Sequence, residues 1–202
     1  MTDALLNLLT WFSPAFPTGG FAYSSGLEWV VEQKTVRDEA SLIAWLEDGL
    51  AQGALWNDAV LLRRAHAGED VTQLALALCS GAERHMETTA QGEAFATAAA
   101  AWGGTAPAPY PVAAGRLAAA HGIAVDDVTL AYLHAAVANQ ISAAMRLIPL
   151  GQSAGLRVLK TLEPSIRATR AASASLALGT AAWSADIAGQ NHETQYTRLF
   201  RT

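Results

Sequence analysis

The sequence predicts an all-α fold: a single domain over residues 1–202, built as an orthogonal bundle of about eight to ten helices with an irregular tail at 186–202. Alanine and leucine dominate the chain and favour helices, whereas the β-branched residues that favour strands are sparse and scattered. Apolar residues recur at helical spacing between short segments rich in proline and glycine. No internal repeat and no linker divides the sequence, so one bundle accounts for its length.

The first boundaries are set by turn residues. Residues 4–12 are expected to form a helix that stops at the Pro- and Gly-rich segment 13–20. Ser24 or Ser25 can cap the next helix, with Glu28 as its capping-box partner. The same signals predict helices over 38–50, 57–67, 70–79, 82–102, 112–121, 126–148 and 152–178.

The longest of these helices is expected to begin at Asp126 and Asp127 and to end at Pro149. One of its faces carries small and apolar residues that permit close packing, namely Val128, Ala131, Ala135, Ala138, Ile141, Met145 and Ile148. Such a face packs inside its own domain more often than against a second copy. In the next helix Pro164 marks a kink or a join, and after Gly179 the helical pattern decays.

Composition limits the class of partner and the compartment. The formal net charge is -5 and only two lysines occur, Lys34 and Lys160, which disfavours a nucleic-acid partner. No apolar run reaches the ~18 residues of a membrane span, and the N-terminus carries Asp3 without a basic region, so a cytoplasmic protein is expected. Cys79 is the only cysteine, and its apolar surroundings favour a buried, unreactive thiol.

Signals for metal, nucleotide or cofactor chemistry are weak. The five histidines include no pair at i, i+4, no Cys-x-x-Cys occurs, and Tyr196 stands where a zinc-protease motif starting at His192 would need its second ligand. The sequence has no P-loop, and Gly19-Gly20 is typical of a turn. We therefore expect no metal site and no cofactor.

One catalytic alternative has a matching motif. Residues 151–155 fit G-x-S-x-G, and Asp186 and His192 follow Ser153 in the order of an α/β-hydrolase triad. The nucleophile elbow of that fold needs a strand before the serine, whereas here a long helix precedes it. A serine hydrolase is thus the alternative function, disfavoured by its context.

The C-terminal tail has the composition of an interface. Tyr196, Leu199 and Phe200 stand beside Arg198 and Arg201, and aromatic residues and arginine are enriched in protein contacts. One interpretation is a terminus folded back onto the domain; the other is a mobile peptide that docks on a partner. Because no strong helical stripe ties the tail to the bundle, we expect loose packing until a partner orders it.

Three separated stretches resemble the family of urease accessory proteins UreF. Residues 13–28 are close to the family pattern S-P-A-x-P-x-G-G-F-x-Y-S-x-G-L-E and read SPAFPTGGFAYSSGLE. Residues 146–152 match R-x-x-P-L-G-Q with RLIPLGQ, and residues 192–201 match H-E-x-Q-Y-x-R-L-F-R with HETQYTRLFR. Phe16, Ala22 and Gln190-Asn191 depart from the usual residues.

The resemblance implies an all-α, non-catalytic protein that dimerises, binds the accessory protein UreD (UreH in some species) and recruits the GTPase UreG. Nickel would pass from UreG to the urease apoprotein in this GTP-dependent chaperone complex, without nickel ligands in this chain. A related possibility is regulation of GTP hydrolysis through Arg146 or Arg198. The motifs supply the residues expected to bind partners: Pro17, Gly19, Gly20, Phe21, Tyr23, Glu28, Arg146, Pro149, Gly151, Gln152, His192, Glu193, Tyr196, Arg198, Leu199, Phe200 and Arg201.

Overall fold

The computed structural model describes residues 2–175, 177–179 and 181–201, and in these ranges the chain forms helices and no strand. The predicted all-α fold is therefore confirmed. The α-helices are α1 (Thr2–Trp11), α2 (Leu27–Glu32), α3 (Glu39–Gln52), α4 (Ala54–His66), α5 (Thr72–Ala77), α6 (Ala82–Ala98), α7 (Tyr110–Ala120), α8 (Val125–Leu147), α9 (Gln152–Ala172) and α10 (Trp183–His192). Short 3-10 turns lie at η1 (Gly20–Ala22), η2 (Ala99–Trp102) and η3 (Ser173–Ser175).

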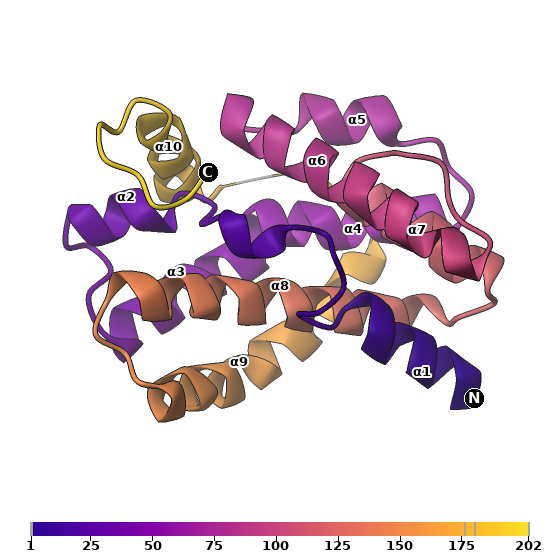
Figure 1. The fold of residues 1–202 in the computed structure, drawn as a ribbon, viewed down its shortest axis with the longest axis horizontal. Coiled ribbons are helices and arrows are strands. Elements are labelled where there is room, and N and C mark those ends of the chain that lie inside the picture. The colour runs from indigo at the N-terminus through magenta and orange to yellow at the C-terminus, as the bar shows by residue number, and fades with distance from the viewer. Residues whose placement is uncertain (1, 176, 180, 202) are drawn as a thin grey trace.

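Helix α8 runs through the middle of the bundle (Figure 1) and contributes residues to two apolar clusters. One cluster joins α1, α4, α6 and α7 around Trp11, Phe95 and Leu117. The other joins α2, α3, α9 and α10 around Leu46 and Leu162. Helix α8 supplies Val128 and Tyr132 to the first cluster and Leu133, Val137 and Ile141 to the second, so both sides of the bundle depend on it.

Of the stripe expected on α8, Val128, Ile141 and Ile148 are buried, and the alanines and Met145 are half-buried. The most deeply buried positions also include Tyr132, Leu133 and Val137, which lie beside that stripe. The helix thus packs on more than one side, because it is surrounded by neighbours rather than lying on a surface.

Several helix boundaries differ from the sequence-based expectation. The N-cap position of α2 is Gly26, but the Ser24 hydroxyl oxygen accepts from the backbone N–H of Glu28 in the first turn at 3.4 Å. The Glu28 side chain binds the tail instead of forming a capping box. Helix α8 begins after Ala124, which leaves Asp126 in the first turn, where it pairs with Arg63. Asp38 does cap α3, and Ser41 completes a capping box with it.

Two differences concern the end of the chain. Helix α9 continues through Pro164, which lies at an exposed position of the helix. Helix α10 was not predicted, because its outer face has no regular apolar pattern. It is held instead by Ala188 and His192, which are buried against neighbouring helices.

Close backbone approach explains one glycine of the sequence. A Cβ atom at Gly92 of α6 would lie 1.8 Å from the carbonyl oxygen of Ala108, in the segment that leads into α7. Only glycine lets α6 lie this close to that segment, which positions the acidic N-terminal half of α6 beside α10.

Candidate partner-binding site

The first and third sequence stretches, together with Arg146 of the second, meet at one end of the molecule. Helix α10 packs against α2 and the start of α6, and the tail after it returns over α2 (Figure 1). Arg146, near the end of α8, donates from Nη2 to the Phe21 carbonyl oxygen at 2.7 Å. Its guanidinium also lies 4.1 Å from the centre of the Phe200 ring. Loop, helix end and tail therefore form one surface.

Glu28 joins the first stretch to the third. Its buried carboxylate accepts hydrogen bonds from the backbone N–H groups of Leu199, at 2.7 Å, and Phe200, at 3.0 Å. The same carboxylate faces Nε2 of His192 at 3.1 Å. An ionised carboxylate accepting several hydrogen bonds is well compensated for its burial, so Glu28 acts as a clamp on the tail.

His192 is fully buried between two carboxylates. Its Nδ1 lies 2.7 Å from Oε2 of Glu83, and its Nε2 faces Glu28. Arg198 donates to the other oxygen of Glu83 at 2.8 Å. Each ring nitrogen therefore lies within hydrogen-bond distance of a buried carboxylate. His192 of α10 and Arg198 of the tail thus bring polar partners to both acids.

Glu193 completes the attachment by capping α6. Its Oε1 accepts from the backbone N–H of Ala82 at 2.7 Å and from that of Glu83 at 3.3 Å. A carboxylate at a helix N-terminus satisfies free N–H groups and interacts favourably with the helix dipole. Gln190 adds a hydrogen bond to the Ser80 carbonyl oxygen at 2.8 Å.

In this structure the tail is packed against the bundle. Phe200 is 5% exposed and His192 lies in a helix, so both are part of the folded chain. The sequence-based argument looked for a helical apolar stripe, whereas the tail contacts the bundle through an ion pair and backbone hydrogen bonds. Arg198 also already has its acceptor, Glu83. Ordering of the tail by a partner stays a prediction.

The Pro-Gly loop is shaped by different residues than expected. Gly19 and Gly26 have φ angles of 73° and 80°, which favour glycine, whereas Gly20 does not need such a conformation. A Cβ at Gly20 would make only ordinary contacts, the nearest at 3.6 Å. The Gly20 carbonyl oxygen instead accepts from Asn139 of α8 at 2.9 Å. The conformational argument therefore applies to Gly19, not to Gly20.

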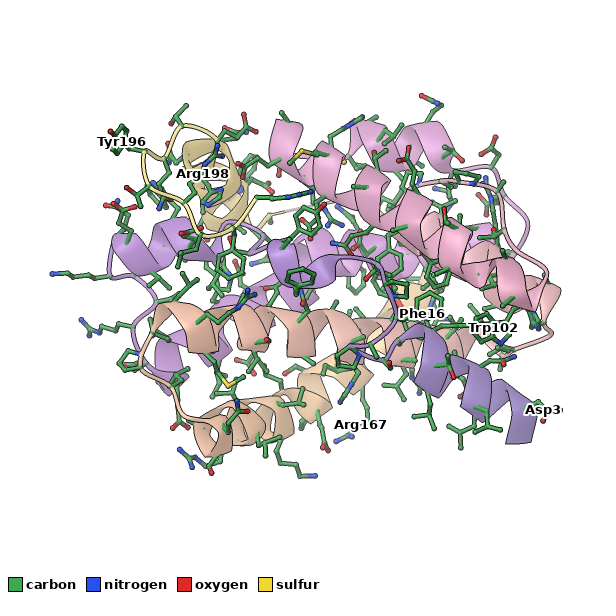
Figure 2. All side chains as sticks on the ribbon, viewed as in Figure 1. Asp3, Phe16, Trp102, Arg167, Tyr196 and Arg198 are labelled. Carbon is green, nitrogen blue, oxygen red and sulfur yellow. The ribbon has the colours of Figure 1, made fainter. Side chains whose placement is uncertain are left out.

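Of the two aromatic residues that the loop was expected to present, only one is exposed. Phe21 is 71% exposed, whereas Tyr23 is 4% exposed and belongs to the interior. Tyr196 and Leu199 of the tail are also exposed, at 103% and 75%. Figure 2 shows Tyr196 at the outer edge of the tail and Arg198 closer to α10. We call the exposed side chains of Phe21, Tyr196 and Leu199 the tail face.

The second stretch is only partly at this site. Pro149, Gly151 and Gln152 are exposed in the connection between α8 and α9, where Gly151 is the N-cap of α9. This connection leads away from α10 (Figure 1), so only Arg146 of the stretch reaches the tail. Pro17 is exposed near α1 and lines a shallow apolar hollow with Phe16 and Trp102, two aromatic residues that Figure 2 labels.

Sequence reasoning missed the acidic residues on which the tail rests. Glu83 and Glu87 lie one turn apart on α6, and both are buried. Ser25 of the loop donates to Glu87 at 3.3 Å, and Arg84 pairs with Glu87 and with Asp58 of α4. Burial raises the pKa of the Glu87 carboxyl. Acids in the first turns of a helix are ordinary, so the sequence holds no signal of this network.

The alternative hydrolase triad is not assembled. Ser153 is exposed in the first turn of α9, and both ring nitrogens of His192 face Glu28 and Glu83. The start of α9 and α10 lie on opposite sides of the molecule (Figure 1), and in the described ranges no strand precedes Ser153.

Cys79 is half-buried rather than fully buried, and burial raises the pKa of its thiol, which makes it a poor nucleophile.

Within residues 2–175, 177–179 and 181–201, no three His, Cys, Asp or Glu side chains are grouped so as to hold a metal ion. No helix in the part of the chain that the structure describes is long and apolar enough to cross a membrane.

Comparison with known proteins gives a consistent result. The family model UreF matches residues 36–163. A urease accessory protein UreF from Bradyrhizobium sp. (strain BTAi1) is 49% identical, with 98% of this chain and 92% of the relative aligned. UreF proteins from Rhodopseudomonas palustris (strain BisA53) and Cereibacter sphaeroides (strain ATCC 17023) are 48% and 49% identical over the full length of this chain.

Proposed function

The chain belongs to the UreF family of urease accessory proteins, and from this premise we propose that it is a scaffold in the loading of nickel into urease. In this scheme the chain binds UreD (UreH) and recruits the GTPase UreG, and the resulting chaperone complex passes nickel to the urease apoprotein. The chain itself makes and breaks no bond.

The observation that carries this proposal is the convergence of the family's separated sequence stretches on one surface. Glu28 and Arg146 hold the loop and the tail together. Other side chains of the loop and the tail stay exposed to solvent. What they leave exposed is aromatic and aliphatic, flanked by arginines. Aromatic residues and arginine are the side chains that contribute most to protein–protein binding.

The structure changes which tail residues we assign to the partner. Phe200 and Arg198 contact their own chain, so they position the tail rather than anchor it elsewhere. Tyr196 and Leu199, together with Phe21, remain exposed for UreD. The partner is thus expected to bind the outer side of a docked tail.

Regulation of GTP hydrolysis by a donated arginine receives less support. An arginine that stabilises phosphoryl transfer must extend its guanidinium into the partner's site. Arg146 donates to the Phe21 carbonyl and covers Phe200, and Arg198 pairs with Glu83. Both guanidinium groups have structural contacts that they would have to give up, so the scaffold role is favoured.

Self-association is the second part of the proposal, and helix α1 offers a surface for it. Leu5, Leu6 and Leu9 are 58%, 57% and 62% exposed on this helix. They lie near the apolar hollow lined by Thr10, Phe16, Pro17 and Trp102. A two-fold contact must be self-complementary, and an uncharged ridge beside an apolar hollow meets that condition better than the arginine-flanked tail face.

Co-purification tests the scaffold proposal directly. Tagged chain expressed with UreD and UreG should retain both partners, and UreG should be lost when UreD is left out. Measuring GTP hydrolysis by UreG with and without the complex then separates a scaffold, which leaves the rate of the chemical step unchanged, from a regulator of that step. Failure to retain UreD under conditions where both proteins are folded would refute the proposal.

A further inference from the structure

The tail lies against a surface, which we call the groove, that has the features of a peptide-binding site. The groove lies between the Pro-Gly loop, α2, the start of α6 and the end of α8. It satisfies three successive backbone N–H groups of the tail. Those of Leu199 and Phe200 donate to Glu28 at 2.7 and 3.0 Å, and that of Arg201 donates to the Ala22 carbonyl oxygen at 2.8 Å. Hydrogen bonds to the main chain can bind an extended segment of the same chain or of another molecule, because they do not depend on how the segment is connected.

Side chains add specificity in an alternating pattern. Phe200 points into the groove beneath Arg146 and is 5% exposed, whereas Leu199 before it and Arg201 after it are exposed. Alternation of buried and exposed side chains is what an extended peptide shows when it lies on a surface. Arg198 adds a second point of recognition, since its guanidinium pairs with the buried Glu83 at 2.8 Å. The groove thus reads an arginine and, two residues later, an aromatic ring.

The segment that joins this peptide to α10 makes local hydrogen bonds. Thr194 and Gln195 donate from their backbone N–H groups to Asn191 and His192, and the Gln195 amide donates to Thr197. These contacts form a turn that returns the chain to the groove. The contacts with the groove are made by residues 198–201. The turn tethers these residues close to the groove and so raises their local concentration there.

We propose that this groove is a self-contained receptor for extended peptides of the form Arg-x-Phe-x, and that it accepts the tail of a second copy of this chain as well as its own. Residues of the groove make the backbone hydrogen bonds, the ion pair and the ring contact of residues 198–201 described above. The groove is formed by helices whose apolar core includes Phe200 of the tail. The chain's own tail has the advantage of proximity, which for a short connection corresponds to a local concentration of about a millimolar. Two copies therefore exchange their tails when the binding of each tail to its own groove is weakened, or when the protein is concentrated. The inference goes beyond the scaffold role and does not depend on which protein binds the tail face.

The first test uses the full-length chain with a weakened tail. Replacing Arg198→Ala and Phe200→Ala together removes both side-chain anchors and leaves α10 in place. A fluorescent peptide of sequence TQYTRLFR, corresponding to residues 194–201, should then bind saturably, as measured by fluorescence anisotropy. Binding should fall about tenfold or more when Glu28→Gln is added to the chain, or when the peptide carries alanine in place of its phenylalanine.

Charge needs its own control, because the peptide is cationic and the chain has a formal net charge of -5. A scrambled peptide of the same composition should bind at least about tenfold more weakly than TQYTRLFR at moderate salt. Equal binding of the two peptides, or no saturable binding of TQYTRLFR to the folded variant, would overturn the proposal.

A second measurement covers the case in which the double variant does not fold. Isotope-labelled wild-type chain is mixed with excess unlabelled peptide, and the hydrogen exchange of its Leu199 and Phe200 amides is followed by NMR. Displacement of the chain's own tail should speed exchange at these two amides, while the amides of α8 are unaffected. Unchanged exchange at saturating peptide would show that the groove does not accept the segment in trans.

Discussion

His192 and Glu28 are 164 positions apart in sequence, yet the Nε2 atom of His192 lies 3.1 Å from Oε2 of Glu28 in the interior of the protein. Three elements meet at this contact: α2, the end of α10 and the tail, whose backbone binds the same carboxylate. The second ring nitrogen of His192 links them to α6 through Glu83. One imidazole therefore holds two otherwise repelling acids next to each other.

Removing this imidazole should release the tail. In a His192→Ala variant, Glu28 and Glu83 stay buried without their shared hydrogen-bond partner, and leaving buried acceptors unpaired costs about 3 kcal/mol. We expect the tail to detach before the bundle unfolds, so hydrogen exchange at the Leu199 and Phe200 amides should accelerate strongly. Asn191→Ala, at the exposed neighbouring position, is the matched control and should change neither exchange nor stability. Native-like exchange in His192→Ala would mean that these hydrogen bonds do not hold the tail.

A pair of glycines separates backbone strain from helix packing. Gly19 and Gly26 both have left-handed backbone angles, so alanine is strained at either position. A Cβ at Gly26 would also lie 2.9 Å from the Gly189 nitrogen of α10, whereas one at Gly19 would meet nothing within 4 Å. Gly26→Ala should therefore reduce the free energy of unfolding by about 1–2 kcal/mol more than Gly19→Ala does. Equal losses in urea denaturation would show that α10 can move aside without cost.

Glu87 gives the stability of the protein a predictable pH dependence. Burial raises its pKa above the ordinary value of 4.5, so the folded state holds this proton more tightly than the unfolded state. The stabilising contribution is complete below the ordinary value and is lost as the pH rises through the folded-state pKa. A Glu87→Gln variant cannot titrate here, so its stability relative to wild type should improve between about pH 4 and pH 7. Urea unfolding at both pH values measures this difference; Glu93→Gln, at an exposed position of α6, is the control. Parallel pH dependence of wild type and Glu87→Gln would contradict the prediction.

Sequence reasoning was most successful where local physical chemistry decides the structure. Asp38 begins α3 as expected, and the Pro-Gly segment ends α1 as expected. It was least successful where distant residues decide: α10 is stabilised by Glu28 and Glu83, which lie far away in the chain, and no local pattern reports that pairing. The same holds for Tyr23, whose burial depends on how the loop is folded over the bundle.

The leucines of α1 provide a test of self-association. A charge at Leu6, which is 57% exposed, should prevent apolar contact between two copies without disturbing the core. We expect Leu6→Arg to sediment as a monomer at concentrations where the wild type is a dimer. Leu156→Arg, at a 67% exposed position of α9, is the control and should not alter the oligomeric state. If the wild type dimerises and Leu6→Arg does so equally well, the α1 surface is not the interface.

The tail face predicts a separation between binding and folding. Tyr196 is 103% exposed and Leu199 is 75% exposed, so alanine at either position removes few contacts within the chain. If UreD covers these side chains, each truncation should weaken binding by about thirtyfold, the value of a buried anchor worth ~2 kcal/mol. Phe200→Ala should behave differently, because it opens a cavity under Arg146 and loosens the tail itself.

Deleting residues 192–202 would not separate UreD binding from folding. It would remove His192 and Arg198 together and leave Glu28 and Glu83 without partners, so a loss of UreD binding would be accompanied by a loss of stability. The informative comparison is Tyr196→Ala and Leu199→Ala against Phe200→Ala, with UreD affinity measured by calorimetry and thermal midpoints measured on the same samples. The first two variants should lose affinity at an unchanged midpoint, whereas the third should lose both. Native affinity in both surface variants would move the UreD contact away from the tail face, while a lowered midpoint in either would show that these side chains serve the fold.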